Sequence, residues 1–343
     1  MDMRILGATG MRVSPLCLGA MMFGKIGNPD HDACVRTIHR AIDGGINFID
    51  TADGYSRGES EEIVAKAIKG RRDSLVIATK FFSQMSDTDP NMRGGSRRWI
   101  VRAVEDSLRR LGTDYIDLYQ FHRYDPATDV EEVLFTLTDL VRQGKIRQFG
   151  SSSFPADRVV ESQWIAEKRG TLRFRSEQPV YSIFNRDIER FLLPACQRYG
   201  MGVLTFSPLD GGFLTGRYRT PEDLSGDNRI AYFGRMMNRT FDPHAAWIGR
   251  KFELVAELET LAAELGVTLA QMAVAFVIRH PGVTAAIIGP RTLDQLEGLL
   301  PAGDLTLPAE TLDRIDALAP PGTTLNPLYD MPSGTTPAAL GRA

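Results

Sequence analysis

The sequence is poor in cysteine and histidine, and it contains no long apolar run. Its 343 residues include only three cysteines and five histidines. The number of cysteines is odd, they are widely spaced, and no two form a C-x-x-C pair; they are Cys17, Cys34 and Cys196. This pattern predicts buried reduced thiols in a reducing compartment. No apolar run approaches the roughly 20 residues of a membrane span, and no apolar signal segment follows Met1. We therefore expect a cytoplasmic protein.

Charge of one sign is not in excess either. The chain has 40 basic and 43 acidic residues, a net charge of −3 and an isoelectric point of about 6.0. The basic residues are scattered among acids instead of forming a stripe. This distribution argues against nucleic acid and acidic membranes as partners. It favours a small-molecule ligand and says nothing about the oligomeric state.

Three motifs that would indicate other folds or chemistries are also missing. The absence of a G-x-G-x-x-G loop argues against a doubly wound sheet, and the absence of G-x-S-x-G argues against a serine hydrolase. A metal-dependent barrel hydrolase would need clustered ligands. The histidines show no such clustering, so we expect no metal; they are His31, His39, His122, His244 and His280.

What the sequence does contain is a regular alternation of short apolar segments and segments with helical periodicity. The predicted strands are 16–18, 48–50, 75–79, 115–121, 146–150, 174–178, 202–206 and 285–288. The predicted helices are 31–43, 60–68, 96–111, 130–143, 156–168, 188–199, 247–265, 269–279 and 293–300. Eight such units predict an α/β protein with a (β/α)8 TIM barrel. A β-hairpin over residues 4–14 is predicted to precede it.

The barrel is predicted to be one domain over residues 1–319. The tail, residues 320–343, is rich in Pro, Gly and Thr, so we expect it to be extended or poorly ordered. Two connections, 81–95 and 207–246, are too long to be simple loops. Both follow the carboxyl ends of predicted strands, the face on which barrel enzymes build their sites.

Three consecutive predicted strands end in titratable groups. Asp50 ends the second strand and Tyr55 lies in the loop after it, Lys80 ends the third, and His122 ends the fourth. A lysine ammonium within about 4–6 Å favours phenolate, and a carboxylate would keep a buried lysine charged. This set predicts Tyr55 as the proton donor to an oxygen that gains charge, such as a carbonyl accepting hydride. His122 would orient that oxygen.

Here the sequence resembles the aldo-keto reductase superfamily. Asp50, Tyr55, Lys80 and His122 match its catalytic tetrad, and residues 45–52 (GINFIDTA) and 107–117 (SLRRLGTDYID) resemble family signatures. The resemblance covers roughly residues 4–318. It implies a barrel that binds NADPH without a Rossmann fold and transfers hydride to an aldehyde or ketone.

Two other groups within this superfamily are similar to the chain. One is the bacterial aldo-keto reductases of deoxysugar pathways, which implies a reductase of nucleotide-linked keto-sugars. The other is the channel-associated β subunits, which implies a non-catalytic NADPH-binding regulatory subunit. The complete tetrad favours a catalytic protein over the second alternative.

The resemblance also implies a cofactor site. Ser152, Ser153 and Gln178 would bind the nicotinamide carboxamide, although the family often has Asn where this chain has Ser153. Phe206 would stack on the nicotinamide ring, and Arg291 would pair with the 2′-phosphate that distinguishes NADP from NAD. The implied cofactor-binding residues are Gly19, Ala20, Met21, Asp50, Ser152, Ser153, Gln178, Phe206, Ser207, Pro208, Leu209, Gly211, Arg217, Gly289, Arg291 and Gln295.

Two further segments concern adenine and the substrate. Gly298 and Leu299 stand where the family usually has an acid and an Asn that contact adenine, so we expect a different arrangement there. Residues 228–239 combine arginines with aromatic residues, and Arg93 lies in the other long loop. Such a loop is usually just solvated. The alternative is a lid that recognises a polar or phosphate-bearing substrate. If the loop is such a lid, we expect the substrate to be a sugar-like carbonyl compound.

Overall fold

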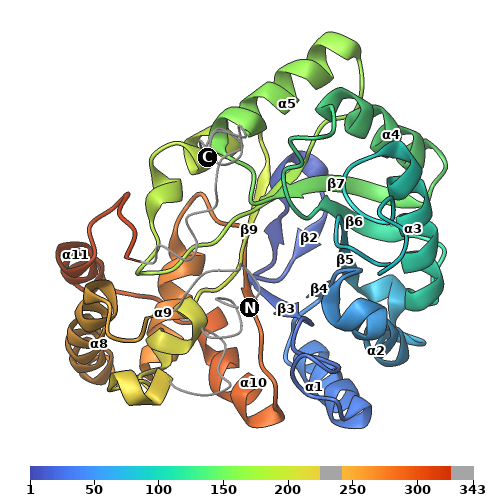
Figure 1. Cartoon of the computed structure of the whole chain (residues 1–343). Helices are drawn as coiled ribbons and strands as arrows, with labels where there is room; N and C mark the ends of the chain where they lie inside the picture. Colours follow the sequence, from blue (N-terminus) through green and yellow to red (C-terminus); the bar gives the residue numbers. More distant parts are fainter. Residues whose placement is uncertain (225–241, 326–343) are drawn as a thin grey trace.

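The computed structural model describes residues 1–224 and 242–325, which form a barrel of parallel strands surrounded by helices (Figure 1). The closed sheet has eight strands in the order β10-β3-β4-β5-β6-β7-β8-β9. Every neighbouring pair is parallel, including β10 with β3, which closes the barrel. The barrel strands are β3 (Leu16–Gly19), β4 (Phe48–Asp50), β5 (Val76–Phe81), β6 (Ile116–Phe121), β7 (Ile146–Ser152), β8 (Ser176–Gln178), β9 (Gly202–Thr205) and β10 (Ala285–Ile288). The predicted (β/α)8 barrel is confirmed.

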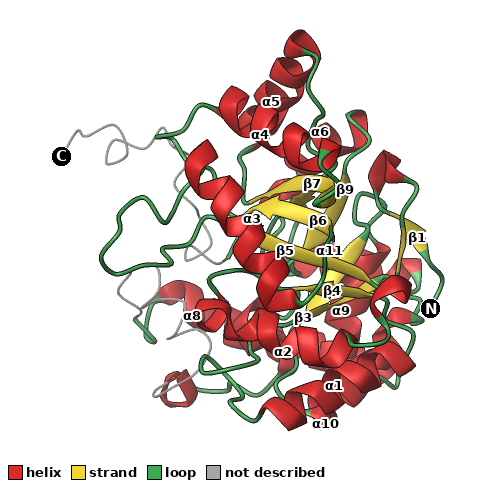
Figure 2. Cartoon of the chain, turned by 90° about the vertical axis from the view of Figure 1, so that its right-hand side faces the viewer, coloured by secondary structure: helices red, strands yellow, loops and turns green. Residues whose placement is uncertain are grey.

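The helices pack around the outside of this sheet (Figure 2). They are α1 (His31–Asp43), α2 (Glu59–Ile68), α3 (Arg97–Leu111), α4 (Val130–Arg142), α5 (Ala156–Arg169), α6 (Leu192–Arg198), α8 (Ala246–Glu264), α9 (Leu269–Arg279), α10 (Leu293–Leu299) and α11 (Ala309–Leu318). Local capping explains several of their starts. The Ser96 side chain accepts from the Trp99 N–H to begin α3, and Thr268 with Gln271 forms a capping box at α9.

Two helical regions differ from the prediction. A helix was predicted over residues 188–199, but the chain forms a short 3-10 turn (Asp187–Glu189) and then α6. Phe191 between them has φ −135° and ψ −41°, outside the helical range, which separates the two. The helix α11 was not predicted. It buries Thr311 and Ile315.

The predicted amino-terminal hairpin, β1 (Arg4–Ile5) with β2 (Arg12–Val13), is also confirmed and pairs in antiparallel fashion. Its Leu6 and Val13 are fully buried against the residues inside the barrel, such as Phe48 and Leu118. The hairpin packs on the smaller of two apolar clusters, which lies inside the barrel. The larger cluster lies between the strands and the helices. The side chains of the sheet thus fill the barrel as a solid core, and ligands are restricted to the loop end.

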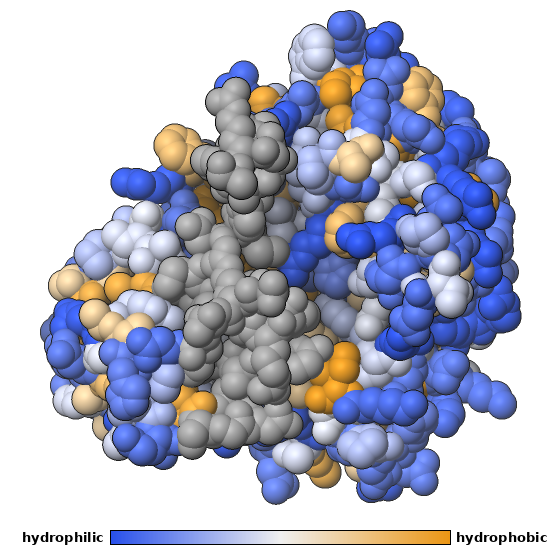
Figure 3. Space-filling model, in the orientation of Figure 1, coloured by the Kyte–Doolittle hydropathy of each residue, from blue (hydrophilic) through white to orange (hydrophobic). Residues whose placement is uncertain are grey.

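The surface is mainly hydrophilic over α2, α3 and α4, with small separate hydrophobic patches (Figure 3). Within the described ranges, no single helix is long and apolar enough to cross a membrane. Helices α8 and α9 pass that test only as a pair, and they are bent by 88°.

The start of the predicted tail lies against the barrel. The N–H of Arg186 donates to the Thr323 carbonyl at 2.7 Å, and the N–H of Leu325 donates to the Phe184 carbonyl at 2.8 Å. Residues 326–343 lie outside the described residues, and so do residues 228–239 of the predicted lid. The extended tail and the lid therefore stay predictions.

Candidate active site

The four residues of the predicted tetrad come together at the carboxyl ends of β4, β5 and β6. The Nζ of Lys80 donates to the Asp50 carboxylate, to the Thr51 carbonyl at 2.8 Å and to the Tyr55 hydroxyl at 3.2 Å. The ring of His122 meets the ring of Tyr55 edge to face, with centroids 5.7 Å apart. One phenol thus lies between a lysine and an imidazole, as the sequence predicted.

The charges in this cluster are set by burial and by one another. Burial by itself would lower the pKa of Lys80, but the Asp50 carboxylate and Tyr55 outweigh it and the pKa is raised. Lys80 therefore stays an ammonium despite being fully buried. Burial, with Lys80 and Arg123 nearby, holds the pKa of His122 well below its usual range. His122 is therefore a neutral imidazole with one N–H to donate.

Asp50 is held by more than its lysine. The side-chain amides of Gln120 and Gln178 donate to its second oxygen at 3.1 and 2.9 Å, and Gln178 also donates to the Gln120 carbonyl oxygen at 3.2 Å. With its NH₂ group used in this way, Gln178 presents its carbonyl oxygen as an acceptor, which suits the NH₂ of a carboxamide. The sequence reasoning missed Gln120, although it lies only two positions before His122.

The tetrad opens into a cavity of about 100 Å³, and a larger cavity of about 700 Å³ adjoins it. Met22, Ser207, Ile287 and Gly289 line both, so the two form one continuous cleft. The larger volume is within the usual range for ligand sites. Neither lining contains an acidic residue other than Asp50, which is already paired with Lys80.

Most of the predicted cofactor-binding residues line this cleft. Those around the smaller cavity are Gly19, Met21, Asp50, Ser152, Gln178, Phe206, Ser207 and Gly289. Those around the larger cavity are Ser207, Pro208, Leu209, Gly211, Arg217, Gly289, Arg291 and Gln295. Ala20 and Ser153 are in neither lining. Ala20 is fully buried, and the hydroxyl of Ser153 accepts from Arg123.

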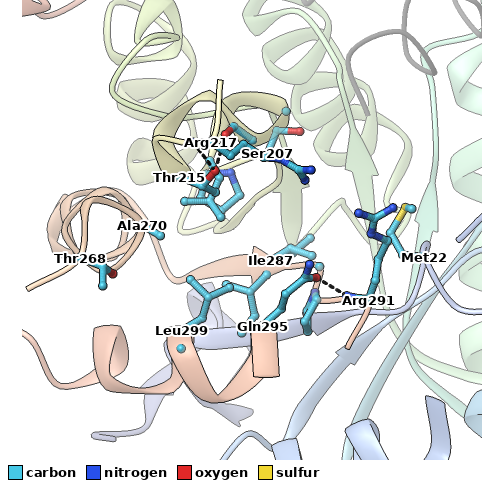
Figure 4. A pocket seen from close by; sticks show the side chains of 18 of the residues that line it. Met22, Ser207, Thr215, Arg217, Thr268, Ala270, Ile287, Arg291, Gln295 and Leu299 are labelled. Atoms are coloured by element: carbon cyan, nitrogen blue, oxygen red, sulfur yellow. Dashed lines mark hydrogen bonds between the residues drawn. The ribbon is translucent and has the colours of Figure 1, made fainter. Parts of the chain in front are cut away.

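The larger cavity has two arginines from different elements on its walls (Figure 4). Arg217 follows the 3-10 turn η5 (Asp210–Thr215), and Arg291 follows β10. Neither has an acidic partner among the described residues. In the loop before Arg217, Ser207, Asp210 and Gly212 have φ values of +56°, +48° and +107°. A tightly curled loop that carries one guanidinium group and faces a second across the cavity suits an anionic ligand such as a phosphate.

The end of this cavity near α10 has no charged side chain among its described lining residues. Gly298 and Leu299 line it together with Thr268 and Ala270 at the start of α9. A Cβ added at Gly298 would meet nothing within 4 Å, so this position leaves open space on the wall. The sequence reasoning did not include Thr268 and Ala270. Their only local signal is the capping box of α9, which indicates a helix start and not a binding site.

A second buried ion pair holds the loop of the larger cavity. Lys251 of α8 donates to the carboxylate of Asp210, and both side chains are completely buried. The charge of Asp210 is therefore neutralised and does not repel an anion in the neighbouring loop. This pair was not predicted, because residues 41 positions apart in sequence give no local signal.

No group of His, Cys, Asp and Glu side chains in the described part of the chain could hold a metal ion. The three cysteines are buried and free. Burial raises the pKa values of Cys17, Cys34 and Cys196, which keeps them as thiols.

Comparison with known proteins identifies the family of the chain. Residues 15–320 match the model of the Aldo/keto reductase family. The chain is 38% identical to an uncharacterized oxidoreductase, YrpG, of Bacillus subtilis, over 99% of both chains. It is 33% identical to a probable voltage-gated potassium channel subunit beta of rice (Oryza sativa), over 93% of this chain and 96% of that one. It is 32% identical to the aldo-keto reductase YhdN of Bacillus subtilis, over 93% of both. The chain therefore belongs to the aldo/keto reductase family.

Proposed function

We propose that this protein reduces an aldehyde or ketone to an alcohol with NADPH as the hydride donor. The observation that carries the proposal is the continuous cleft, which joins the tetrad at one end to Arg217 and Arg291 at the other. A dinucleotide needs such a cleft, because its reactive ring and its phosphates lie far apart. The cytoplasm, where NADPH is available, is the proposed location.

The residues of the chain fit the cofactor in a defined order along the cleft. Ser152 and Gln178 would hold the carboxamide, and Phe206 would stack on the ring. The curled loop with Arg217 would bind the pyrophosphate, and Arg291 would bind the 2′-phosphate. When bound, NADPH supplies the hydride that goes to the carbonyl carbon.

Tyr55 is the proposed general acid. Its hydroxyl gives a proton to the carbonyl oxygen as charge develops there, and the ammonium of Lys80, 3.2 Å from that hydroxyl, stabilises the phenolate left behind. Asp50 keeps Lys80 charged, and its own position is fixed by Gln120 and Gln178. The neutral imidazole of His122 donates its N–H to the same oxygen and orients it.

A regulatory role without catalysis is the competing function, since some relatives carry the name of potassium channel β subunits. The complete tetrad, in which Lys80 donates to Asp50 and Tyr55, favours catalysis. For the substrate we propose a sugar-like carbonyl, with a nucleotide-linked keto-deoxysugar as the more specific alternative. We propose neither nucleic acid nor a membrane as a partner.

The direct test is NADPH oxidation against a panel of aldehydes, ketones, keto-sugars and nucleotide-linked keto-sugars. We expect the highest kcat/KM for a sugar-like substrate. If simple aromatic aldehydes matched or exceeded every sugar, the substrate proposal would be wrong. If cofactor bound but no carbonyl compound were reduced, the regulatory alternative would replace the enzyme.

The cofactor preference is tested at Arg291. A charge-assisted hydrogen bond to phosphate contributes about 1.5–3 kcal/mol, so Arg291→Ala should raise the KM for NADPH about 10-fold or more. The KM for NADH, which lacks the 2′-phosphate, should change little. An equal effect on both cofactors would show that Arg291 does not distinguish them.

A further inference from the structure

Arg123 is a charged residue of the catalytic cavity to which neither the tetrad nor the proposed cofactor contacts give a role. It follows His122 directly, in the loop after β6, and both residues line the cavity with Asp50 and Tyr55. Among the described residues its guanidinium makes one hydrogen bond, from Nη1 to the Ser153 hydroxyl at 2.8 Å. A guanidinium has five N–H donors, so most of its hydrogen-bonding capacity is unused.

Three other arginines with little exposure are paired with acids, and a fourth, Arg4, donates to the backbone carbonyls of Ile278, Val283 and Thr284. Arg72 pairs with Asp117 at 2.7 Å, and Arg110 pairs with Glu61 at 2.7 Å. Arg186 pairs with Glu189 at 2.8 Å. Such pairing is the rule because removing a charge from water is costly unless it is compensated.

Arg123 departs from that rule. Within residues 1–224 and 242–325 it has no acidic partner. The one acid that lines its cavity, Asp50, is bound to Lys80, Gln120 and Gln178. A cation that faces a cavity without a partner from its own chain is suited to an anion brought by a ligand.

The position of Arg123 indicates which ligand this is. Arg217 and Arg291, the proposed partners of the cofactor phosphates, line the larger cavity, and Arg123 does not. Arg123 lies instead at the tetrad, where Tyr55 and His122 would meet the carbonyl oxygen. An anion bound there belongs to the substrate.

We propose that Arg123 selects carbonyl substrates that carry a carboxylate or a phosphate ester near the reacting carbon. This inference rests on the proposed reductase function and narrows its substrate class. The planar guanidinium can bind either anion through two parallel N–H···O bonds. Its hydrogen bond to the Ser153 hydroxyl can be kept at the same time. Arg123 would then be a specificity-determining residue, and the chemistry would remain with the tetrad.

The test compares matched substrates that differ in the anion alone. The carboxylate pair is 4-carboxybenzaldehyde with its methyl ester, and the phosphate pair is glyceraldehyde 3-phosphate with glyceraldehyde. We expect Arg123→Gln to lower kcat/KM for the anionic member of at least one pair about 10- to 100-fold, the usual range for a charged hydrogen bond. The neutral members should change less than about 3-fold, and Arg123→Lys should restore part of the loss. The pair with the larger effect identifies the anion.

Arg57→Gln is the matched control. Arg57 lies two residues after Tyr55, but it is exposed, pairs with Asp87 and does not line the cavity. Its removal deletes the same charge close to the site and should leave the anionic-to-neutral ratio unchanged. If Arg57→Gln lowered the ratio as much as Arg123→Gln, general electrostatics would explain the effect and the proposal would be overturned.

Two further results would separate this inference from the proposed function. An equal loss with anionic and neutral substrates, together with weaker NADPH binding, would mean that Arg123 only positions Ser153. The inference about Arg123 would then fail, and the proposed reductase function would be unaffected.

If the wild-type protein reduced none of these compounds, the proposed reductase function would fail. Calorimetric titration with benzoate and with inorganic phosphate in the presence of NADP⁺ would then decide. Binding that Arg123→Gln weakens about 10-fold would keep the anion site, and equal binding would remove it.

Discussion

The described part of the chain contains two buried aspartate–lysine pairs, and they have different surroundings. Asp50 with Lys80 lies at the ends of β4 and β5, and Asp210 with Lys251 joins η5 to α8. None of the four side chains is more than 3% exposed. By residue type and burial, the two pairs are equivalent.

The two pairs differ in the other groups that contact them. Lys80 also contacts the Tyr55 hydroxyl, and Asp50 receives two amide donors. Lys251 is instead surrounded by aromatic rings, with Phe213 at 4.8 Å and Trp247 at 5.0 Å from its Nζ.

The pKa values follow these surroundings. Burial lowers the pKa of Lys251, and Asp210 does not fully reverse it, whereas the pKa of Lys80 is raised. A buried ion pair alone is therefore no sign of catalysis. A titratable neighbour that reaches the cavity makes the difference.

The strongest test of this comparison is Lys251→Met. Removing one partner leaves the other charge buried without compensation, which typically destabilises a protein by about 3–5 kcal/mol. We expect a loss of that order in the free energy of unfolding, measured by urea denaturation. At saturating NADPH the folded fraction should keep its kcat, because Lys251 does not touch the tetrad, whereas the KM for NADPH should rise, because the unpaired Asp210 charge lies in the loop of the larger cavity.

The control is the double variant Lys251→Met with Asp210→Asn, which removes both charges. It should recover much of the lost stability, because no unpaired charge remains. A loss below about 1 kcal/mol in the single variant, or a strong loss of kcat with stability intact, would contradict a structural role for this pair.

Tyr55→Phe tests the other side of the comparison. Deleting the hydroxyl removes the proposed proton donor and should lower turnover about 100-fold or more, which corresponds to about 2.7 kcal/mol. NADPH binding, measured by quenching of intrinsic fluorescence, should be nearly unchanged. Near-normal turnover would remove Tyr55 from its assigned role.

Asp53 is another buried acid, and it forms no ion pair with a lysine among the described residues. It therefore extends the comparison. Its backbone N–H donates to the Lys80 carbonyl, and no side chain among the described residues donates to its carboxyl oxygens. Burial, followed by the charge of Glu61, raises its pKa from 3.8 to about 8. The folded protein therefore keeps a proton that the unfolded chain releases near pH 4.

The sign of the pH effect follows from that difference. The stabilisation is fully present below pH 4 and is lost as the pH rises toward 8, by about 1.4 kcal/mol per pH unit for one proton. Asp53→Asn stays neutral and avoids this loss. Between pH 6 and 7, wild type should lose about 1.4 kcal/mol of unfolding free energy relative to Asp53→Asn. Parallel stability curves would show that Asp53 is ionised in the folded protein.

The sequence was sufficient for those features of the site that follow from strand order. Asp50, Lys80 and His122 end consecutive predicted strands, and in a closed parallel barrel the ends of neighbouring strands must be adjacent. The positions of Gln178 and Phe206 at strand ends follow in the same way. The tetrad could therefore be assembled without coordinates, and the family resemblance added the cofactor side.

Other features could not be predicted, because they depend on where side chains point. The use of the Gln178 amide by Asp50 and the unpaired guanidinium of Arg123 are both of this kind. The helix break at Phe191, where the backbone leaves the helical range, was not predicted either.

The sequence by itself determined the barrel and the residues at its catalytic end, because periodicity fixes the elements and their order fixes the neighbours. Only the tertiary structure decided which charges are paired. Asp210 pairs with Lys251, which lies 41 positions away in the sequence, whereas Arg123 pairs with no acid in the described chain. The physical reason is that the energy of a buried charge depends on the groups within a few ångströms of it, and those groups come from strands and helices far apart in the chain.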